Sequence, residues 1–426
     1  MKSGLSFLVG ALRCEIDELE QLARTSELVA TIGRLVHALQ RERGISNVLL
    51  ASRGQRFVAQ RDAQIAECLR QEQAVRLAFD QLDAADGRIG NGARLFSRIA
   101  WVLPGMDALT GLRQRIGALD IDAAQSTAAF GKLIAGLIAV VFEAADGATD
   151  PEISRLLVAL FNFMQGKEFA GQERACGAAA FASGRNDGAR QQQWLHLIAS
   201  QEHCFALFAD FAAPGLAEVW GSVQAAAQLA ELERLRRIAC AAPAGVALDS
   251  ELSQAWFDCC TRRIDAMQAV EERLAADLRR LCLHKTTQAR SELQAHEALL
   301  ASLQGESGAE TADLADFFLD APATPDAPAG GAPYGRQLER SILDMVQEQS
   351  RRLQAMGDEL DTVRAALNER KLVERAKGLL MAHRRIREEE AHKMLRQTAM
   401  NQGRRLVEVA ESVLAMAEYL PVDKAP

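Results

Sequence analysis

The chain has 426 residues and a formal net charge of −8, with 49% hydrophobic and 25% charged residues. This composition is ordinary for a soluble globular protein, and the length leaves room for two or three domains. No uninterrupted apolar run approaches the roughly 20 residues that span a bilayer, and Leu5 to Leu12 runs into charged residues without a cleavage site. We therefore expect a cytoplasmic protein that does not enter a membrane.

Cysteine spacing and motif content argue against several kinds of chemistry. The eight cysteines form no C-x-x-C pair and most lie among apolar residues, so we expect buried reduced thiols and no metal site. The sequence has no glycine-rich phosphate loop and no nucleophile motif. We therefore expect neither an enzyme nor a bound cofactor.

Residues 1–303 read as one helix after another. Alanine, leucine, glutamine, arginine and glutamate are abundant, and turn signals such as Pro104-Gly105 and Pro214-Gly215 separate the helical segments. This pattern predicts an all-α fold, in which two packed four-helix bundles (residues 1–147 and 148–303) form the first domain.

Short sequence motifs recur in the two halves with the same internal spacing. Glu42-Arg43 followed by Ala51-Ser52 returns as Glu173-Arg174 followed by Ala182-Ser183. In the same way, Leu109-x-x-Leu112-Arg113 returns as Leu232-x-x-Leu235-Arg236. These recurrences predict that the two bundles are related.

Arginines interrupt the apolar faces of the predicted helices. Arg43 continues the stripe formed by Leu28, Ile32, Leu35 and Leu39, whereas Arg41 points to the opposite side. Arg236 and Arg174 lie within similar stripes in the second half. A buried guanidinium is too costly to leave unpaired. Each of these arginines therefore needs either a carboxylate of the chain or an anion from outside.

Gln40-Arg41-Glu42-Arg43-Gly44-Ile45-Ser46-Asn47, together with Glu173-Arg174, resembles the NIT domain. This helical sensor responds to nitrate and nitrite. The resemblance implies that one arginine from each half brackets the anion, because a planar guanidinium suits a planar, weakly hydrated oxyanion. The matching positions are Arg43 for the first arginine and Arg236 for the second, with Arg237 as the alternative to Arg236. Further candidates for contact with the anion are Arg174, Ser46 and Asn47.

Two connecting segments follow the sensor. Residues 304–335 are rich in glycine, alanine, proline and acidic residues, which predicts a linker. In residues 336–362, apolar residues recur at alternating steps of three and four, which predicts a coiled-coil connector. The connector could form a homodimer or pack on the sensor within one chain.

The last segment, 363–424, is a small basic module. Residues 363–426 contain 13 Lys and Arg against 9 Asp and Glu, a balance of +4, so the remainder of the chain carries −12. Three amphipathic helices can be drawn on the segment. A basic module on an acidic carrier points to a polyanionic partner.

Glu374-Arg375-Ala376-Lys377-Gly378-Leu379-Leu380-Met381, followed by Leu395-Arg396 and Ala399-Met400, resembles the ANTAR domain. This three-helix module of bacterial antiterminators binds leader-mRNA hairpins. The resemblance implies RNA contacts by Arg370, Arg375, Lys377 and Arg396.

Together, the two resemblances imply a transcription antitermination regulator that responds to nitrate or nitrite. The alternatives are a helical protein-interaction scaffold and a DNA-binding regulator that is gated by another small anion.

Overall fold

The structure is a computed structural model that describes residues 4–84, 92–145, 148, 150–185, 188–224, 227–241, 246–305 and most positions between 351 and 417. Within these residues every named element is a helix, and the only β-type pairing is one isolated bridge between Arg185 and Ala247. The all-α prediction is therefore confirmed.

The first half of the sensor contains five helices. They are α1 (Gly4–Ala51), α2 (Val58–Ala84), α3 (Gly92–Asp107), α4 (Leu109–Gly117) and α5 (Ala123–Ala145). The break expected at Pro104-Gly105 comes slightly later, because α3 continues through Pro104 and ends at Asp107. Pro104 has no N–H to donate to the carbonyl oxygen of Ala100, so the helical hydrogen bonding is interrupted close to the end of α3, and α4 begins two residues after Asp107.

The second half repeats this plan. Its helices are α6 (Pro151–Ser183), α7 (Gly188–Phe211), α8 (Pro214–Gln224), α9 (Ala227–Ala241) and α10 (Leu252–Gly305). Helix α6 begins with a capping arrangement, in which Asp150 accepts a hydrogen bond from the backbone N–H of Ile153 at 3.0 Å. It ends at Gly184, whose φ of 62° is the left-handed conformation that favours glycine.

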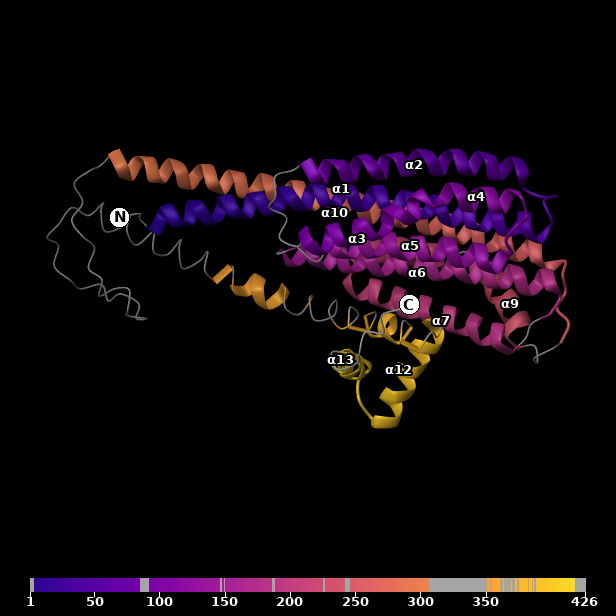
Figure 1. Cartoon of the computed structure of the whole chain (residues 1–426). Coiled ribbons are helices and arrows are strands. Elements are labelled where there is room, and N and C mark those ends of the chain that lie inside the picture. Colours follow the sequence, from indigo (N-terminus) through magenta and orange to yellow (C-terminus); the bar gives the residue numbers. More distant parts are fainter. Residues whose placement is uncertain are drawn as a thin grey trace, which may run out of the picture.

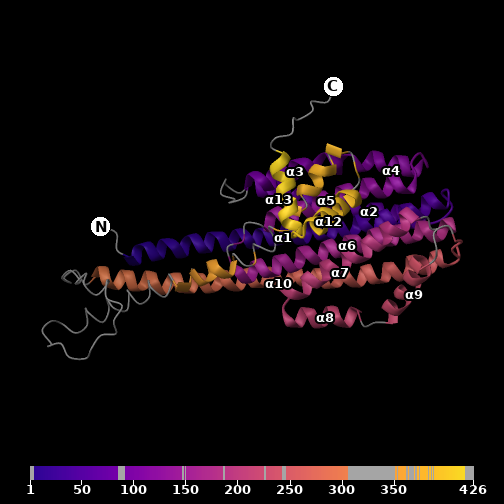
Figure 2. The same cartoon turned by 90° about the horizontal axis from the view of Figure 1, so that it is seen from below.

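The long helices α1, α6 and α10 form the centre of the sensor (Figure 1). A continuous apolar core surrounds them, and a second cluster around Trp194 and Trp256 fills the end of the second half. The N-terminal part of α1 and the C-terminal part of α10 extend side by side beyond the other helices (Figures 1 and 2). Because α1 belongs to the first half and α6 to the second, their contact joins the two halves.

Helix α5 is apolar enough to be considered as a membrane span. Residues Ala123–Ala144 are long and apolar enough to cross a bilayer by length and composition. The expectation from sequence was that no apolar run is long enough to span a bilayer, but this stretch qualifies when a single charge, Lys132, is tolerated. In the folded chain 61% of that window is buried, and a core helix passes the same test.

The C-terminal module lies beside α7 in Figure 1, where the ring centres of His196 and His392 are 5.3 Å apart, and Figure 2 shows it over α3 and α5. Its described helices include α12 (Glu388–Gln402) and α13 (Leu406–Ala417). A small core of its own contains Ala376, Leu395, Ala399, Val409 and Ala410. Nearly all of the predicted linker, the start of the connector and Arg370 lie outside the described residues.

Candidate anion site

Arg43 and Arg174 face each other where α1 meets α6. Their exposed fractions are 0% and 2%. Each guanidinium lies against a glycine of the opposite helix: a Cβ added to Gly171 would be 2.5 Å from Arg43 Nη2, and one added to Gly44 would be 2.5 Å from Arg174 Nη2. The two glycines therefore let both guanidiniums enter the contact between the halves.

Arg43 is held by a carboxylate of the same chain. Its Nη1 and Nη2 donate to Glu168 Oε1 and Oε2 at 2.6 and 3.2 Å. Gln40 and Gln172 also donate to this carboxylate, at 2.9 and 3.0 Å. The charge of Arg43 is therefore balanced within α6.

Arg174 has no such balance. Its Nη2 donates to the carbonyl oxygen of Gln40 at 2.8 Å, and its Nη1 donates to Thr261 Oγ1 at 3.0 Å. The guanidinium carbon lies 5.1 Å from the centre of the Phe257 ring. No carboxylate of the described residues lies within ion-pair distance of it. Burial, and then the charge of Arg43, lower the pKa of Arg174 to about 10.

Arg43 has a carboxylate partner and Arg174 has none among the described residues, and this difference corresponds to the residue six positions before each arginine. Glu168 lies six residues before Arg174, and the residue six before Arg43 is His37. Burial, and then the charge of Lys167, lower the pKa of His37 to about 2, so this imidazole is neutral at physiological pH. The two arginines, Glu168 and His37 therefore carry a net charge of +1. The next carboxylate is that of Asp265, whose Oδ1 lies 3.7 Å from His37 Nε2 and which forms no ion pair with either arginine. A monoanion bound directly between the guanidiniums would balance the second of them.

Polar atoms around the two guanidiniums remain without a hydrogen-bond partner. They include Nε of Arg43, Nε of Arg174, Oγ of Ser46 and Oδ1 of Asn47. Ser46 is fully buried, and Asn47 donates its Nδ2 to Thr127 at 2.8 Å. Asn47 Oδ1 can only accept, but the two Nε–H groups and the Ser46 hydroxyl are donors. Unsatisfied donors at this depth are costly, and a small oxyanion that accepts from these three would remove the cost.

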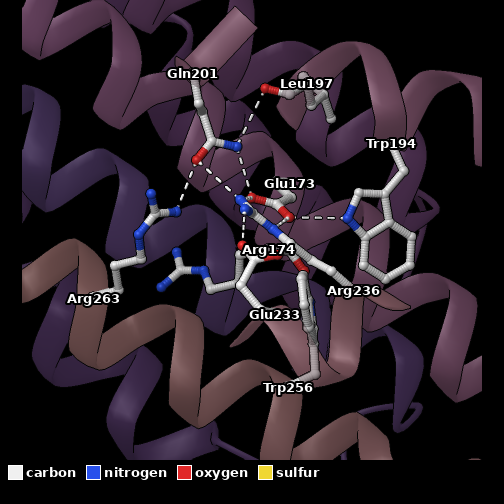
Figure 3. Close-up of polar contacts among 9 residues, drawn as sticks. All are labelled: Glu173, Arg174, Trp194, Leu197, Gln201, Glu233, Arg236, Trp256 and Arg263. Carbon is white, nitrogen blue, oxygen red and sulfur yellow. Dashed lines mark hydrogen bonds and ion pairs between the residues drawn. The ribbon is translucent and has the colours of Figure 1, made fainter. Parts of the chain in front are cut away.

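Arg236 does not join this pair. Its Nε and Nη2 donate to Glu173 Oε1 and Oε2 at 2.7 and 2.6 Å, and its Nη1 donates to Glu233 at 2.6 Å (Figure 3). Trp194 and Gln201 complete the shell around Glu173. Burial alone would lower the pKa of Arg236, but the carboxylates outweigh burial and raise it. Arg236 is therefore engaged by carboxylates of its own half and does not lie beside Arg43 in this structure, and its role as the second anion-binding arginine stays a prediction from the resemblance.

The other half contains the same bracing contact. Arg113 donates its Nε and Nη2 to Glu42 at 2.8 Å each, and its Nη2 also reaches Glu72 at 2.6 Å. Arg113 thus corresponds to Arg236, as the Leu-x-x-Leu-Arg words predicted. The alternative Arg237 is exposed and donates to the carbonyl oxygen of Glu233 at 3.4 Å. Arg174 follows Glu173 as Arg43 follows Glu42, and each guanidinium lies against a glycine of the opposite helix. Arg174 is therefore the counterpart of Arg43.

The site opens into a large groove with a volume of 2690 Å³. Gly44, Asn47 and Arg174 line this groove on the sensor side, and residues of the C-terminal module line it as well. Small-molecule sites usually measure about 300–1,000 Å³, so this groove far exceeds what nitrate needs. The anion site is therefore a small polar part of a larger surface between sensor and module.

The groove also brings together three of the predicted RNA-binding residues. Arg375, Lys377 and Arg396 all line it. Arg375 and Arg396 are exposed, whereas Lys377 is only 6% exposed. The sequence reading missed Lys393, which is exposed and lines the same groove.

Fold and site thus define a helical sensor with a buried cationic centre, joined to a small basic helical module. The family model described as nitrate and nitrite sensing (NIT) matches residues 34–279. The ANTAR domain model matches residues 361–414. The chain belongs to the NIT family and carries an ANTAR domain, a combination that identifies a regulatory protein rather than an enzyme.

Two known proteins match nearly the whole length of this chain. The chain is 36% identical over 411 residues to the nitrate regulatory protein of Klebsiella oxytoca, an alignment that covers 95% of this chain and 93% of the relative. It is also similar to a solved structure of the NasR transcription antiterminator, with 31% identity and a TM-score of 0.59. That match covers 97% of this chain and 99% of the other.

Proposed function

We propose that this protein is a nitrate-responsive transcription antitermination regulator in which nitrate binds between Arg43 and Arg174. The observation that carries the proposal is the buried pair of guanidiniums with one balancing carboxylate. A trigonal monoanion bound there would supply the missing negative charge. It would also accept hydrogen bonds from both arginines.

Glu168 is the internal competitor of the anion. It occupies both terminal nitrogens of Arg43 through hydrogen bonds of 2.6 and 3.2 Å. Arg174 has no comparable partner among the described residues, so we infer that it provides the first anchor and that Arg43 joins as its bonds to Glu168 rearrange. Nitrate would thereby alter the contact between α1 and α6, and hence between the halves.

The effector is the C-terminal module. We infer that Arg375 and Arg396, together with Lys393, contact phosphates of a leader-mRNA hairpin, because they are exposed and line one basic groove. Lys377 is buried and contributes to the packing of the module. Nascent leader RNA and eight free cysteines both suit a cytoplasmic location.

Calorimetry of the full-length chain tests the sensor half of the proposal. Nitrate or nitrite should bind with one site per chain, and chloride and sulfate should bind more weakly, because neither is a flat monoanion. Arg174→Gln should remove binding. Equal heats for all four anions would show that the site responds to charge alone and would contradict the proposal.

RNA binding tests the effector half separately. The full-length chain with nitrate should bind a hairpin that has been selected from a pool with randomised loops. Its affinity should fall steeply with salt, since phosphate contacts release counterions. No enrichment of any hairpin would exclude the effector role and leave anion sensing intact.

A further inference from the structure

We propose that the α3–α5 face of the sensor is a second RNA-binding surface, in which Arg98 and Lys132 contact phosphates and Trp101 stacks on an unpaired base. The inference rests on the proposed RNA binding and extends it to residues outside the C-terminal module. The groove described above joins this face to the module.

The groove is strongly basic in an acidic protein. Its lining contains ten lysines and arginines and three glutamates, whereas the whole chain carries −8. The cations come from both walls. Among the described residues, Lys132 on the sensor and Arg375, Lys393 and Arg396 on the module make no ion pair. The three glutamates offset only part of this positive charge, and one of them, Glu143, lies beside Arg98, so the surplus of cations on the two walls favours a polyanion between them.

Trp101 is the residue of this face that could stack on a nucleic-acid base. Trp101 is 52% exposed, whereas the other three tryptophans of the chain are at most 7% exposed. Its indole lies against Gly136 of α5, where a Cβ would collide with the ring. Lys132 Nζ lies 5.9 Å from the ring centre. An exposed indole that is packed on one side and lies beside a cation is suited to stacking on an unpaired base.

Helix geometry places these side chains on one face. Arg94, Arg98 and Trp101 follow each other at spacings of four and three along α3, and all three line the groove. Arg98 is 47% exposed, and its Nε lies 3.5 Å from Glu143. Opposite them, α5 presents small residues, so the groove remains open. Figure 2 shows the C-terminal helices over this part of the sensor.

Intrinsic fluorescence of the full-length chain with nitrate provides a direct test. Trp101 should account for most of the tryptophan emission that acrylamide quenches, and the selected RNA hairpin should protect it. Trp101→Ala should weaken RNA binding on the order of tenfold, whereas Trp101→Phe should retain it within about twofold. Unchanged affinity in Trp101→Ala would overturn the stacking assignment.

Salt dependence tests the phosphate contacts. Arg98→Gln/Lys132→Gln should reduce the slope of log affinity against log salt by about 1.4. The control Arg70→Gln/Arg76→Gln removes the same charge from α2, on the side of the sensor away from the C-terminal helices (Figure 1), and should leave the slope unchanged. Equal slopes for both double variants would overturn the proposal.

Two further outcomes separate this inference from the proposed function. If the wild-type chain binds no hairpin, both fail. If it binds RNA and the α3–α5 variants bind equally well, only the second surface fails. Poly-glutamate that protects Trp101 as strongly as RNA does would show that the face recognises acidic protein instead and would also overturn the proposal.

Discussion

Arg113 and Arg236 occupy equivalent positions in the two halves of the sensor, and each holds a buried glutamate with Nε and Nη2. Those glutamates directly precede Arg43 and Arg174 in the sequence. Each half therefore contains one arginine that braces its own bundle and one that reaches the other half. We therefore expect Arg113 and Arg236 to contribute to stability and Arg43 and Arg174 to bind the ligand, and mutations can test this division.

Removing a bracing arginine should reduce stability in both halves alike. Arg236→Gln leaves Glu173 buried with an unbalanced charge, so the free energy of unfolding should fall by about 3–5 kcal/mol. Arg113→Gln should cost a similar amount through Glu42. Both variants should still be stabilised by nitrate at temperatures where they remain folded. Denaturant unfolding with and without nitrate measures both quantities. A stable Arg236→Gln protein that ignores nitrate would instead make Arg236 the anchor.

The two bridging arginines should differ from each other when no ligand is present. Arg174→Gln removes a buried charge that lacks a carboxylate, so its cost in stability should be smaller than that of Arg43→Gln, which strands Glu168. Nitrate at a hundred times its dissociation constant should stabilise the wild type by about 2.7 kcal/mol. It should stabilise neither variant. Thermal unfolding across nitrate concentrations decides the matter, and a full nitrate response in Arg174→Gln would refute its role.

Adding one methyl group should perturb the site without changing its charge. In Gly44→Ala the new Cβ would meet Arg174 Nη2 at 2.5 Å, and in Gly171→Ala it would meet Arg43 Nη2 at the same distance. Nitrate affinity should fall at least tenfold in each variant by calorimetry. Gly111→Ala is the matched control, because nothing lies within 4 Å of its added Cβ and alanine favours a helix by about 0.5–1 kcal/mol. Equal affinity in all three variants would mean that the guanidiniums can move aside freely.

His37 should make the sensor sensitive to acid. Its pKa is about 2 in the folded chain and near 6.5 when exposed, so the unfolded state binds the extra proton between these values. The contribution of neutral His37 to the free energy of unfolding is therefore fully present above pH 6.5. Below that pH, protonation of His37 in the unfolded state lowers the free energy of unfolding by about 1.4 kcal/mol for each pH unit. His37→Gln should show a shallower decline between pH 6.5 and 4.5 in denaturant titrations. Glu15 and Glu271, whose pKa values are raised, act in the opposite sense in both proteins and cancel in the difference.

The sequence was sufficient for the fold class and for half of the candidate site. Helical periodicity placed Arg43 on a buried face, because four apolar residues of α1 share that stripe. The spacing of the Leu-x-x-Leu-Arg words correctly related Arg113 to Arg236. The repeat of Glu42-Arg43 as Glu173-Arg174 likewise makes Arg174 the equivalent of Arg43. The resemblance, however, favoured Arg236 as the second anion-binding arginine.

The remaining parts of the site depend on packing between elements distant in the sequence. Thr261 and Phe257 reach Arg174 from α10, and no local pattern marks them. Trp101 appears on α3 as an ordinary apolar residue of an amphipathic helix. Its exposure depends on how α3 lies against Gly136 of α5. Such properties follow from the tertiary arrangement and not from periodicity.

The reciprocal contact between Arg43 and Arg174 also indicates how such a receptor could originate. Two separate copies of an ancestral half, associating about a twofold axis, would already place the same arginine on both sides of an isologous interface. Fusion of the copies into one gene then allows each to diverge alone. Such divergence would account for Glu168 in one copy and the neutral His37 at the matching position of the other, so that two equivalent arginines now share one ion-paired carboxylate.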